Sequence, residues 1–323
     1  MPHAIRIHET GGPEVLRWEE VEVGAPGPGE ARIRQTAVGL NFIDTYHRSG
    51  LYPLPLPAVP GSEAAGIVTE VGPGVTEVKP GDRVAYAGPV GAYAEERRIA
   101  AHRLVPLPAD VDDRLAAAAM LKGMTAQYLL RRTHRVERGE TILLHAAAGG
   151  VGLIAAQWAR SLGAPVIGTV STAAKAALAR EAGCDHVVVT SREDFVARVK
   201  EITGGAGVRV VYDGVGKDTF AGSLDCLAPL GLMVTFGNAS GPVPAISPLV
   251  LSQKGSLFLT RPTLMAYTAR REDLLSTAAD LFAVIRSGAV MVRIEATWPL
   301  REAAAAHEAI ESRRTTGSTV LLP

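Results

Sequence analysis

The sequence predicts an α/β protein in which a β-rich first domain precedes a doubly wound parallel sheet. In residues 1–122, short apolar runs are separated by Gly- and Pro-rich segments such as 24–29 and 79–82. This punctuation is typical of strands joined by tight turns. From residue 123 onward, strands alternate with helices, a pattern typical of a parallel sheet with crossover helices. We therefore expect domains at residues 1–122 and 123–260, with residues 261–323 completing the first domain.

The expected elements follow from the apolar runs in chain order. Strands of the first domain are expected at residues 4–8, 31–38, 64–71 and 83–87. Strands of the second domain are expected at residues 141–146, 166–170, 186–189, 208–212, 232–236 and 256–260. The remaining segment predicts helices near residues 271–287 and 300–312 and a last strand at residues 318–322.

A glycine-rich turn in the second domain predicts a phosphate-binding site. Residues 141–144 form a short apolar strand, and residues 153–162 form an amphipathic stretch that predicts a helix. The turn between them carries the candidate contacts Gly149, Gly150, Val151 and Gly152. Backbone N–H groups at such a helix N-terminus bind a pyrophosphate, and glycine lets the phosphates approach the backbone closely. The spacing differs from the usual G-x-G-x-x-G, so a plain turn without a ligand stays an alternative.

The residues after this helix indicate which dinucleotide is bound. Residues 164–170 predict a second strand, which gives a strand–helix–strand unit of about 30 residues. An NAD-binding unit places Asp or Glu about 20 residues after the glycines, on the ribose 2′-hydroxyl. That position here is Ser171, and Lys175 follows within one helical turn. Hydroxyls and a lysine suit a 2′-phosphate, so the sequence predicts NADPH; the alternative for Lys175 is a solvated helix lysine.

Composition and charge exclude several classes of protein. The 323 residues carry no net formal charge, so we expect no nucleic-acid partner. The cysteines, Cys184 and Cys226, cannot form a disulfide framework or a four-cysteine zinc lobe. The first residues lack a signal-peptide pattern, and the apolar stretch 116–130 is interrupted by Lys122 and Gln127 and cannot span a bilayer. We expect a soluble, cytoplasmic protein with no membrane partner.

The chain resembles the zeta-crystallin-like quinone oxidoreductases of the medium-chain dehydrogenase/reductase superfamily from end to end. The matching stretches are residues 11–16, 39–46, 50–53, 63–66, 145–152, 212–216, 236–238 and 311–313. Each stretch is modestly specific, and all of them in this order are very specific. The resemblance implies a GroES-like β-rich catalytic domain, a Rossmann cofactor domain, NADPH dependence and commonly a homodimer.

The residues themselves argue against a catalytic zinc. Such a zinc needs three nitrogen, sulfur or carboxylate ligands and an open position. The zinc-dependent relatives use a cysteine in the region of Asn41–Asp44 and a histidine just before Glu63, where this chain has Ser62. His47 and His145 could be substitutes, but lone histidines are more often surface or packing residues. The sequence therefore predicts no metal.

Without zinc, the chemistry predicted for the site is quinone reduction in a metal-free interdomain cleft. Hydride addition to a quinone gives a phenolate-like anion that needs only hydrogen-bond donors and a proton source. The candidate catalytic residues are Asn41, Asp44, Tyr46 and Tyr52. We expect NADPH to lie across the cleft with its nicotinamide near Asn41. The proton donor is not identified, and the tyrosines alternatively only shape the pocket.

The resemblance also implies contacts to the cofactor. Beyond Asn41 and the glycine-rich turn, they are Thr125, Tyr128, Ser171, Lys175, Thr190, Val215, Asn238 and Arg313. Some relatives have a tyrosine beside the 2′-phosphate where this chain has Thr190, a departure that loosens the expected NADPH preference. Arg313 alternatively belongs to a solvated basic pair. The segment 255–262 predicts an edge strand that pairs with a second copy in a homodimer.

Two other functions stay open at this stage. One is an NADPH-dependent reductase of α,β-unsaturated carbonyls, whose pocket would look alike in sequence. The other is a cofactor-binding protein with little catalysis, including an RNA-binding role, against which the neutral charge counts.

Overall fold

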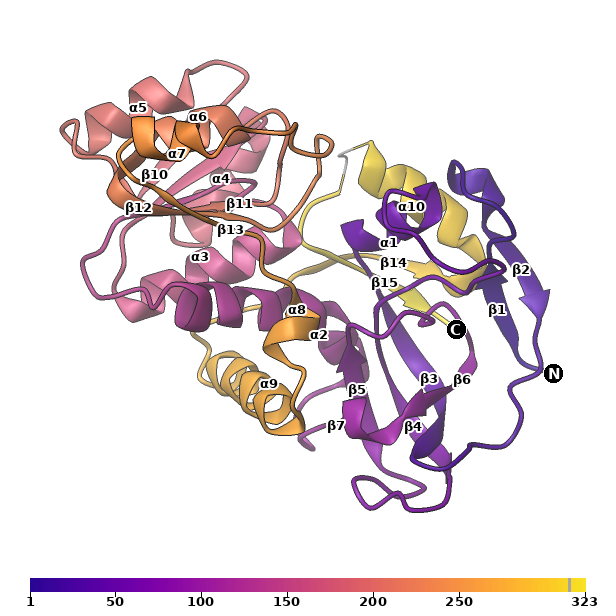
Figure 1. Ribbon diagram of the computed structural model, residues 1–323. Helices are drawn as coiled ribbons and strands as arrows, with labels where there is room; N and C mark the ends of the chain where they lie inside the picture. The colour runs from indigo at the N-terminus through magenta and orange to yellow at the C-terminus, as the bar shows by residue number, and fades with distance from the viewer. Residues whose placement is uncertain (313–314) are drawn as a thin grey trace. The chain divides into compact units, whose positions relative to one another are not determined.

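The computed structural model describes every residue except 313–314 and divides the chain into two compact units. Figure 1 shows the elements of both units. The first unit comprises Met1–Met124, Thr268–Phe282 and Val292–Pro323, and the second comprises Thr125–Tyr267 and Ala283–Met291. The segment after residue 260 is thus itself divided, because Ala283–Met291 belongs to the second unit.

The first unit is built on a mixed sheet with the strand order β14-β15-β3-β4-β5-β7 and with β6 paired to β3. Its strands are β3 (Glu30–Leu40), β4 (Glu63–Val71), β5 (Arg83–Ala87), β6 (Glu96–Ala100), β7 (Val105–Pro106), β14 (Ile294–Pro299) and β15 (Ser318–Leu322). The pair β14–β15 is parallel, and the other pairs are antiparallel. A separate antiparallel pair joins β1 (His3–Arg6) to β2 (Arg17–Glu20).

The core of this unit combines residues that are far apart in sequence. Ile33 of β3, Tyr86 of β5 and Leu321 of β15 are fully buried in one cluster with Leu300 and Ala303. The last two belong to a 3₁₀ turn, Leu300–Glu302, and to helix α10 (Ala303–Glu311). The C-terminal segment therefore contributes directly to the core of the N-terminal sheet.

Three further helices belong wholly or partly to this unit. They are α1 (Phe42–Ser49), α2 (Asp113–Tyr128) and α9 (Arg271–Arg286). Short 3₁₀ turns lie at Pro13–Val15 and Ala101–Arg103. Helix α1 was not expected from the sequence. It begins after Asn41, whose N–H donates to the Asp44 carboxylate (2.9 Å), and ends at Gly50 with φ 83°, a conformation that favours glycine.

The second unit contains a parallel sheet with the order β10-β9-β8-β11-β12-β13. Its strands are β8 (Ile142–Leu144), β9 (Val166–Val170), β10 (His186–Val189), β11 (Val208–Asp213), β12 (Leu227–Thr235) and β13 (Phe258–Thr260). In chain order this is 3-2-1-4-5-6, the doubly wound dinucleotide-binding arrangement. The order reverses between β8 and β11, which is where such sheets bind ligands.

Helices cover both faces of this sheet. The helices of this unit after α2 are α3 (Gly150–Leu162), α4 (Ala173–Glu181), α5 (Phe195–Ile202), α6 (Phe220–Asp225), α7 (Leu249–Gln253) and, beyond the last strand, the short α8 (Leu264–Tyr267). Figure 1 shows α5, α6 and α7 on one face and α3 on the other. Phe220 and Leu224 of α6 pack against Leu143, Val211 and Met233 of the strands.

Outside residues 313–314, no helix has the length and apolar character needed to cross a bilayer.

Candidate functional site

The glycine-rich turn joins β8 to α3 at the carboxyl edge of the parallel sheet. Ala146 has φ 53°, and its carbonyl oxygen accepts from the N–H of Gly149 at 2.8 Å. A Cβ on Gly152 would lie 2.3 Å from that same oxygen, so only glycine fits there. Helix α3 begins at Gly150, and the first N–H groups of a helix have no partner within it. The turn therefore fits a phosphate group, as the sequence predicts.

The ends of β9 and β10 bring the candidate 2′-phosphate residues together. Thr190 follows β10, and both its N–H (2.9 Å) and its hydroxyl (3.3 Å) donate to the carbonyl of Val170, next to Ser171. Thr172 caps α4, accepting at 3.4 Å from the N–H of Lys175 in the first turn. Ser171, Thr190 and the first turn of α4, which carries Lys175, thus lie at the carboxyl ends of β9 and β10.

Val215 and Asn238 lie in neighbouring loops after β11 and β12. Ser240 donates from both its N–H (2.8 Å) and its hydroxyl (2.9 Å) to the carbonyl of Val215. Ala239 donates to the carbonyl of Gly214 at 3.2 Å. These two loops therefore form one hydrogen-bonded surface at the carboxyl edge of the sheet.

Thr125 and Tyr128 occupy the last turn of α2, within the second unit. Tyr128 is buried and stacks on Tyr267 with ring centroids 4.6 Å apart. Burial raises the pKa of its hydroxyl, which is hydrogen-bonded to the side chain of Thr125. A π-helical turn, Leu129–Thr133, follows directly, and such turns are frequent at functional sites.

Asn41 is buried at the start of α1 in the first unit, and its side-chain nitrogen is committed to protein acceptors. Asn41 Nδ2 donates to Glu63 Oε2 at 2.8 Å and lies 3.4 Å from the carbonyl of Gly39. Glu63 also accepts from the N–H of Leu121 (2.6 Å) and from Nζ of Lys122 (3.3 Å). The geometry thus fixes the carboxamide of Asn41 through a buried ion pair.

Asp44 is fully buried and accepts hydrogen bonds on both carboxylate oxygens. Its donors are the Asn41 N–H (2.9 Å), the Ser62 hydroxyl (2.9 Å) and the Tyr93 hydroxyl (3.1 Å). Burial raises the pKa of Asp44 to about 7, although the three hydrogen bonds act in the opposite direction. Asp44 therefore fixes the start of α1 through its hydrogen bonds to Asn41, Ser62 and Tyr93.

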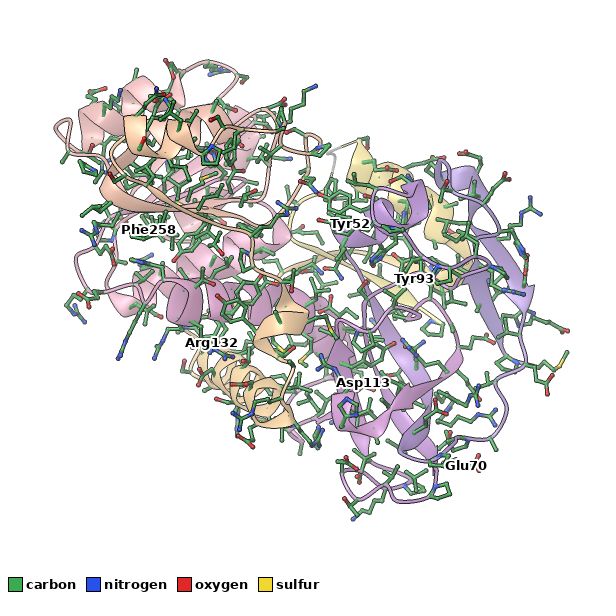
Figure 2. All side chains as sticks on the ribbon, viewed as in Figure 1. Tyr52, Glu70, Tyr93, Asp113, Arg132 and Phe258 are labelled. Carbon is green, nitrogen blue, oxygen red and sulfur yellow. The ribbon has the colours of Figure 1, made fainter. Side chains whose placement is uncertain are left out.

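Tyr46 and Tyr52 belong to an aromatic cluster formed by α1 and the loop after it. Their ring centroids are 5.3 Å apart in an edge-on arrangement, and the Tyr52 N–H donates to the Tyr46 carbonyl at 3.0 Å. Phe42 and His47 adjoin the cluster at 6.2 Å and 6.0 Å. Figure 2 labels Tyr52. The structure therefore brings the two predicted tyrosines together in one aromatic cluster.

Four polar residues around these side chains were missed by the sequence reasoning or not given a role there: Glu63, Tyr93, Lys122 and His307. Tyr93 is within hydrogen-bonding distance of both Asp44 (3.1 Å) and His307 (2.9 Å). Lys122 was noted only as an interruption of an apolar stretch. A charged residue within such a stretch is the signal that could have revealed it, because a buried charge needs a partner.

Two further predictions concern a metal and Arg313. Among the residues that the structure describes, no group of three His, Cys, Asp or Glu side chains could hold a metal ion. Arg313 lies outside the described residues.

Comparison with known proteins agrees with both units. Residues 27–109 match the family model described as the alcohol dehydrogenase GroES-like domain, and residues 150–283 match the one described as zinc-binding dehydrogenase. A quinone oxidoreductase of Pseudomonas aeruginosa is 55% identical, and a 2-haloacrylate reductase of a Burkholderia species is 51% identical. The first alignment covers 100% of both chains; the second covers 100% of this chain and 99% of the relative.

Solved structures give the same result. The crystal structure of Escherichia coli quinone oxidoreductase complexed with NADPH is 51% identical, with a TM-score of 0.98. The comparison covers 99% of this chain and 100% of that one. The predicted fold, a GroES-like domain with a Rossmann cofactor domain, is therefore confirmed. Taken together, these matches show that the chain belongs to the quinone oxidoreductases of the medium-chain dehydrogenase/reductase superfamily.

Proposed function

We propose that the protein reduces quinones with NADPH by hydride transfer. The observation that carries the proposal is the carboxyl edge of the parallel sheet, where a glycine-rich turn and a hydroxyl- and lysine-lined strand end fit a dinucleotide with a 2′-phosphate. Relatives that match this chain over its full length are named quinone oxidoreductases, and one was solved with NADPH.

The residues of the second unit would hold the cofactor. The N–H groups at the start of α3, from Gly149 to Gly152, bind the pyrophosphate. Ser171 would bind the 2′-phosphate by hydroxyl donation and Lys175 by charge. Thr190 stays a predicted contact, and in this structure its hydroxyl donates to the Val170 carbonyl. When bound, NADPH supplies the hydride. Val215 and Asn238 would contact the cofactor from the loops after β11 and β12.

The residues of the first unit would act on the acceptor. Tyr46 and Tyr52 present an apolar wall with hydroxyl donors, which orients a planar quinone and stabilises the negative charge that develops on its oxygen. Asn41, fixed by Glu63, contacts the nicotinamide. Asp44 would not contact the acceptor, because its carboxylate is fully buried. Its role would be to hold α1 in position. Arg313 stays a predicted cofactor contact.

The test is NADPH oxidation, followed at its absorbance band, with 1,4-benzoquinone, a naphthoquinone and 2-cyclohexenone as separate acceptors, and again with NADH. Turnover of the quinones with NADPH supports the proposal. Tight NADPH binding without turnover of any acceptor contradicts it and favours a cofactor-binding protein.

A second candidate is reduction of an activated alkene, in which hydride adds to carbon. The full-length match to a 2-haloacrylate reductase favours it. Turnover of 2-cyclohexenone without turnover of either quinone would establish this alternative.

We also propose a homodimer formed through β13. Phe258 and Leu259 of this edge strand are 60% and 38% exposed, and Figure 2 labels Phe258 on the strand. An exposed apolar edge favours pairing with a second strand. Light scattering of the wild-type protein and of Phe258→Lys tests this: we expect the wild type to be a dimer and Phe258→Lys to be a monomer.

The cytoplasmic location and the absence of a nucleic-acid partner stay predictions. Cell fractionation checks the first, and an electrophoretic shift at low salt checks the second.

A further inference from the structure

Four polar side chains form one buried hydrogen-bonded chain beneath the carboxyl edge of the parallel sheet. The hydroxyl of Thr169 lies 2.8 Å from Nδ1 of His145, and Nε2 of His145 lies 2.9 Å from the hydroxyl of Ser223. Ser223 lies 3.1 Å from Oδ2 of Asp213. All four are buried. They come from β9, the turn after β8, α6 and β11, so the chain crosses the point where the strand order reverses.

The direction of each hydrogen bond follows from the donors available. Asp213 accepts from the N–H groups of Val215 (2.8 Å) and Gly216 (3.0 Å) and from the Thr219 hydroxyl (2.7 Å), as a carboxylate does. The other two partners of Ser223, Asp213 and the Thr219 carbonyl (2.9 Å), are both acceptors. Ser223 therefore gives away its single hydrogen and accepts from Nε2–H of His145.

The state of the imidazole follows from this assignment. Burial lowers the pKa of His145, so the ring is neutral and carries its one hydrogen on Nε2. Its Nδ1 atom then accepts from the hydroxyl of Thr169. The donors of Thr169 and His145 thus both point toward Ser223, whose hydroxyl hydrogen faces Asp213 and the Thr219 carbonyl. The Asp213 carboxylate accepts hydrogen bonds and, among the residues the structure describes, forms no ion pair.

The two ends of this chain hold two different loops. Asp213 fixes residues 214–216 through the Val215 and Gly216 N–H groups, and the same loop carries the backbone contacts to Ala239 and Ser240. His145 immediately precedes the glycine-rich turn, and the Thr169 carbonyl accepts from the Ala147 N–H at 3.0 Å. The chain therefore links the loop after β11 to the turn after β8.

We propose that His145, Ser223 and Asp213 are positioning residues that hold the glycine-rich turn and the loop 214–216 in one fixed relation, so that both contact the same dinucleotide. The inference rests on the proposed NADPH dependence. The three side chains act through the backbone that they anchor, because they are buried below the surface that would contact the cofactor. They would not discriminate the 2′-phosphate, whose proposed contacts are at the ends of β9 and β10.

Amide replacements of His145 separate its two ring nitrogens. Glutamine places its Nε2 near the imidazole Nε2 and keeps the donor to Ser223, whereas asparagine reaches only the Nδ1 position and loses that donor. The test measures the Kd for NADPH and for NADH by fluorescence titration in His145→Gln, His145→Asn, Ser223→Ala and the double variant His145→Asn/Ser223→Ala. Ser161→Ala is the control, because its hydroxyl donates to the Trp158 carbonyl (2.7 Å) within α3, near the end of that helix.

We expect Ser223→Ala and His145→Asn each to raise the Kd for both dinucleotides by the same factor, about five- to tenfold. His145→Gln and Ser161→Ala stay within about twofold of the wild type. The double variant is no weaker than the worse single variant, because both changes break one link.

Three outcomes would overturn the inference. The first is an unchanged Kd in Ser223→Ala and His145→Asn together with a lowered melting temperature. The second is an equal rise in Kd in His145→Gln and His145→Asn. The third is a rise in Kd in the double variant that equals the product of the rises in the two single variants. A wild-type protein that binds NADPH but reduces no quinone contradicts only the proposed function, and the same titrations still decide the role of these residues. A wild-type protein that binds neither dinucleotide contradicts both.

Discussion

The hydroxyl of Tyr93 lies 3.1 Å from Oδ2 of Asp44, and both side chains are buried in the first unit. Tyr93 is labelled in Figure 2. Its hydroxyl also lies 2.9 Å from Nε2 of His307, whose Nδ1 is 3.1 Å from Nη1 of Arg48. Arginine can only donate, so His307 accepts on Nδ1, donates from Nε2 to Tyr93, and leaves the Tyr93 hydrogen for Asp44. Because arginine does not give up its proton, this arrangement fixes α1 and α10 and does not conduct protons between them.

Asp44→Asn should change how stability depends on pH. The pKa of Asp44 is about 7 in the folded protein and about 3.9 in an unfolded chain. The folded state therefore binds more protons between these values, and the contribution of Asp44 to the unfolding free energy is lost as pH rises from about 4 to about 7. We expect this loss, on the order of a few kcal/mol, to be absent in the variant. Urea unfolding at about pH 5 and about pH 8 measures it; identical pH dependence in both proteins would contradict the prediction.

His307 should make stability depend on pH in the opposite sense, and His307→Gln should remove that dependence. Burial lowers the pKa of His307 to about 3, below its value of about 6.5 in an unfolded chain. The unfolded state therefore binds the proton first, and the contribution of His307 is present above about pH 6.5 and lost as pH falls toward 3. We expect the variant to lose less stability than the wild type between about pH 6.5 and about pH 4. Thermal melts across this range provide the measurement, with His8→Gln, at an exposed histidine, as the control.

Lys122→Met should destabilise the first unit. The Lys122 ammonium and the Glu63 carboxylate are 3.3 Å apart, with side chains 7% and 0% exposed. Removing one partner leaves an uncompensated buried charge, at a cost of about 3–5 kcal/mol. The double variant Lys122→Met/Glu63→Gln should recover most of this loss, because the introduced glutamine is neutral and keeps an acceptor for the Leu121 N–H. Chemical denaturation of the wild type, of Lys122→Met, of Glu63→Gln and of the double variant measures the coupling, and additive losses of unfolding free energy would show that the pair is not coupled.

Lys175→Ala should raise the KM for NADPH about tenfold and leave the KM for NADH nearly unchanged, because the 2′-phosphate is the only difference between the two. Steady-state kinetics with both dinucleotides provide the comparison. Lys200→Ala, on α5, is a matched control that should affect neither value. Equal effects of Lys175→Ala on both cofactors would exclude the 2′-phosphate role.

Tyr52→Phe tests whether a tyrosine hydroxyl participates in the reduction. If Tyr52 donates the proton, its loss should lower kcat about a hundredfold with little change in the Kd for NADPH. Tyr46→Phe, in the neighbouring ring of the same cluster, is the matched comparison. Normal turnover in Tyr52→Phe would remove its hydroxyl from the mechanism and leave the ring a packing role.

The sequence allowed the parallel sheet to be predicted closely because its strands are short apolar runs. Strands 166–170 and 186–189 of this sheet have the observed bounds, and so does strand 318–322 in the mixed sheet of the first unit. Helix α1 was missed because it is short and its start depends on the capping contact between Asn41 and Asp44. The expected helix at 300–312 begins instead with a 3₁₀ turn before α10.

The polar network around the candidate site could not be predicted in the same way. Glu63 and Lys122 are 59 positions apart in the chain, and Tyr93 and His307 are 214 apart. No periodicity relates such pairs, because their contact is set by how β4, α2 and α10 pack. The glycine-rich turn, by contrast, is local, and its residues already specify its geometry.

The position of β15 has a consequence for protein synthesis. This strand lies between β14 and β3 in the sheet of the first unit, yet the ribosome makes it after the whole of the second unit. Until then β3 presents an unpaired edge at residues 38–40, where it later pairs with β15. The second unit can therefore complete its sheet first. During that time the sheet of the first unit is incomplete, and the exposed edge of β3 can bind chaperones or aggregate.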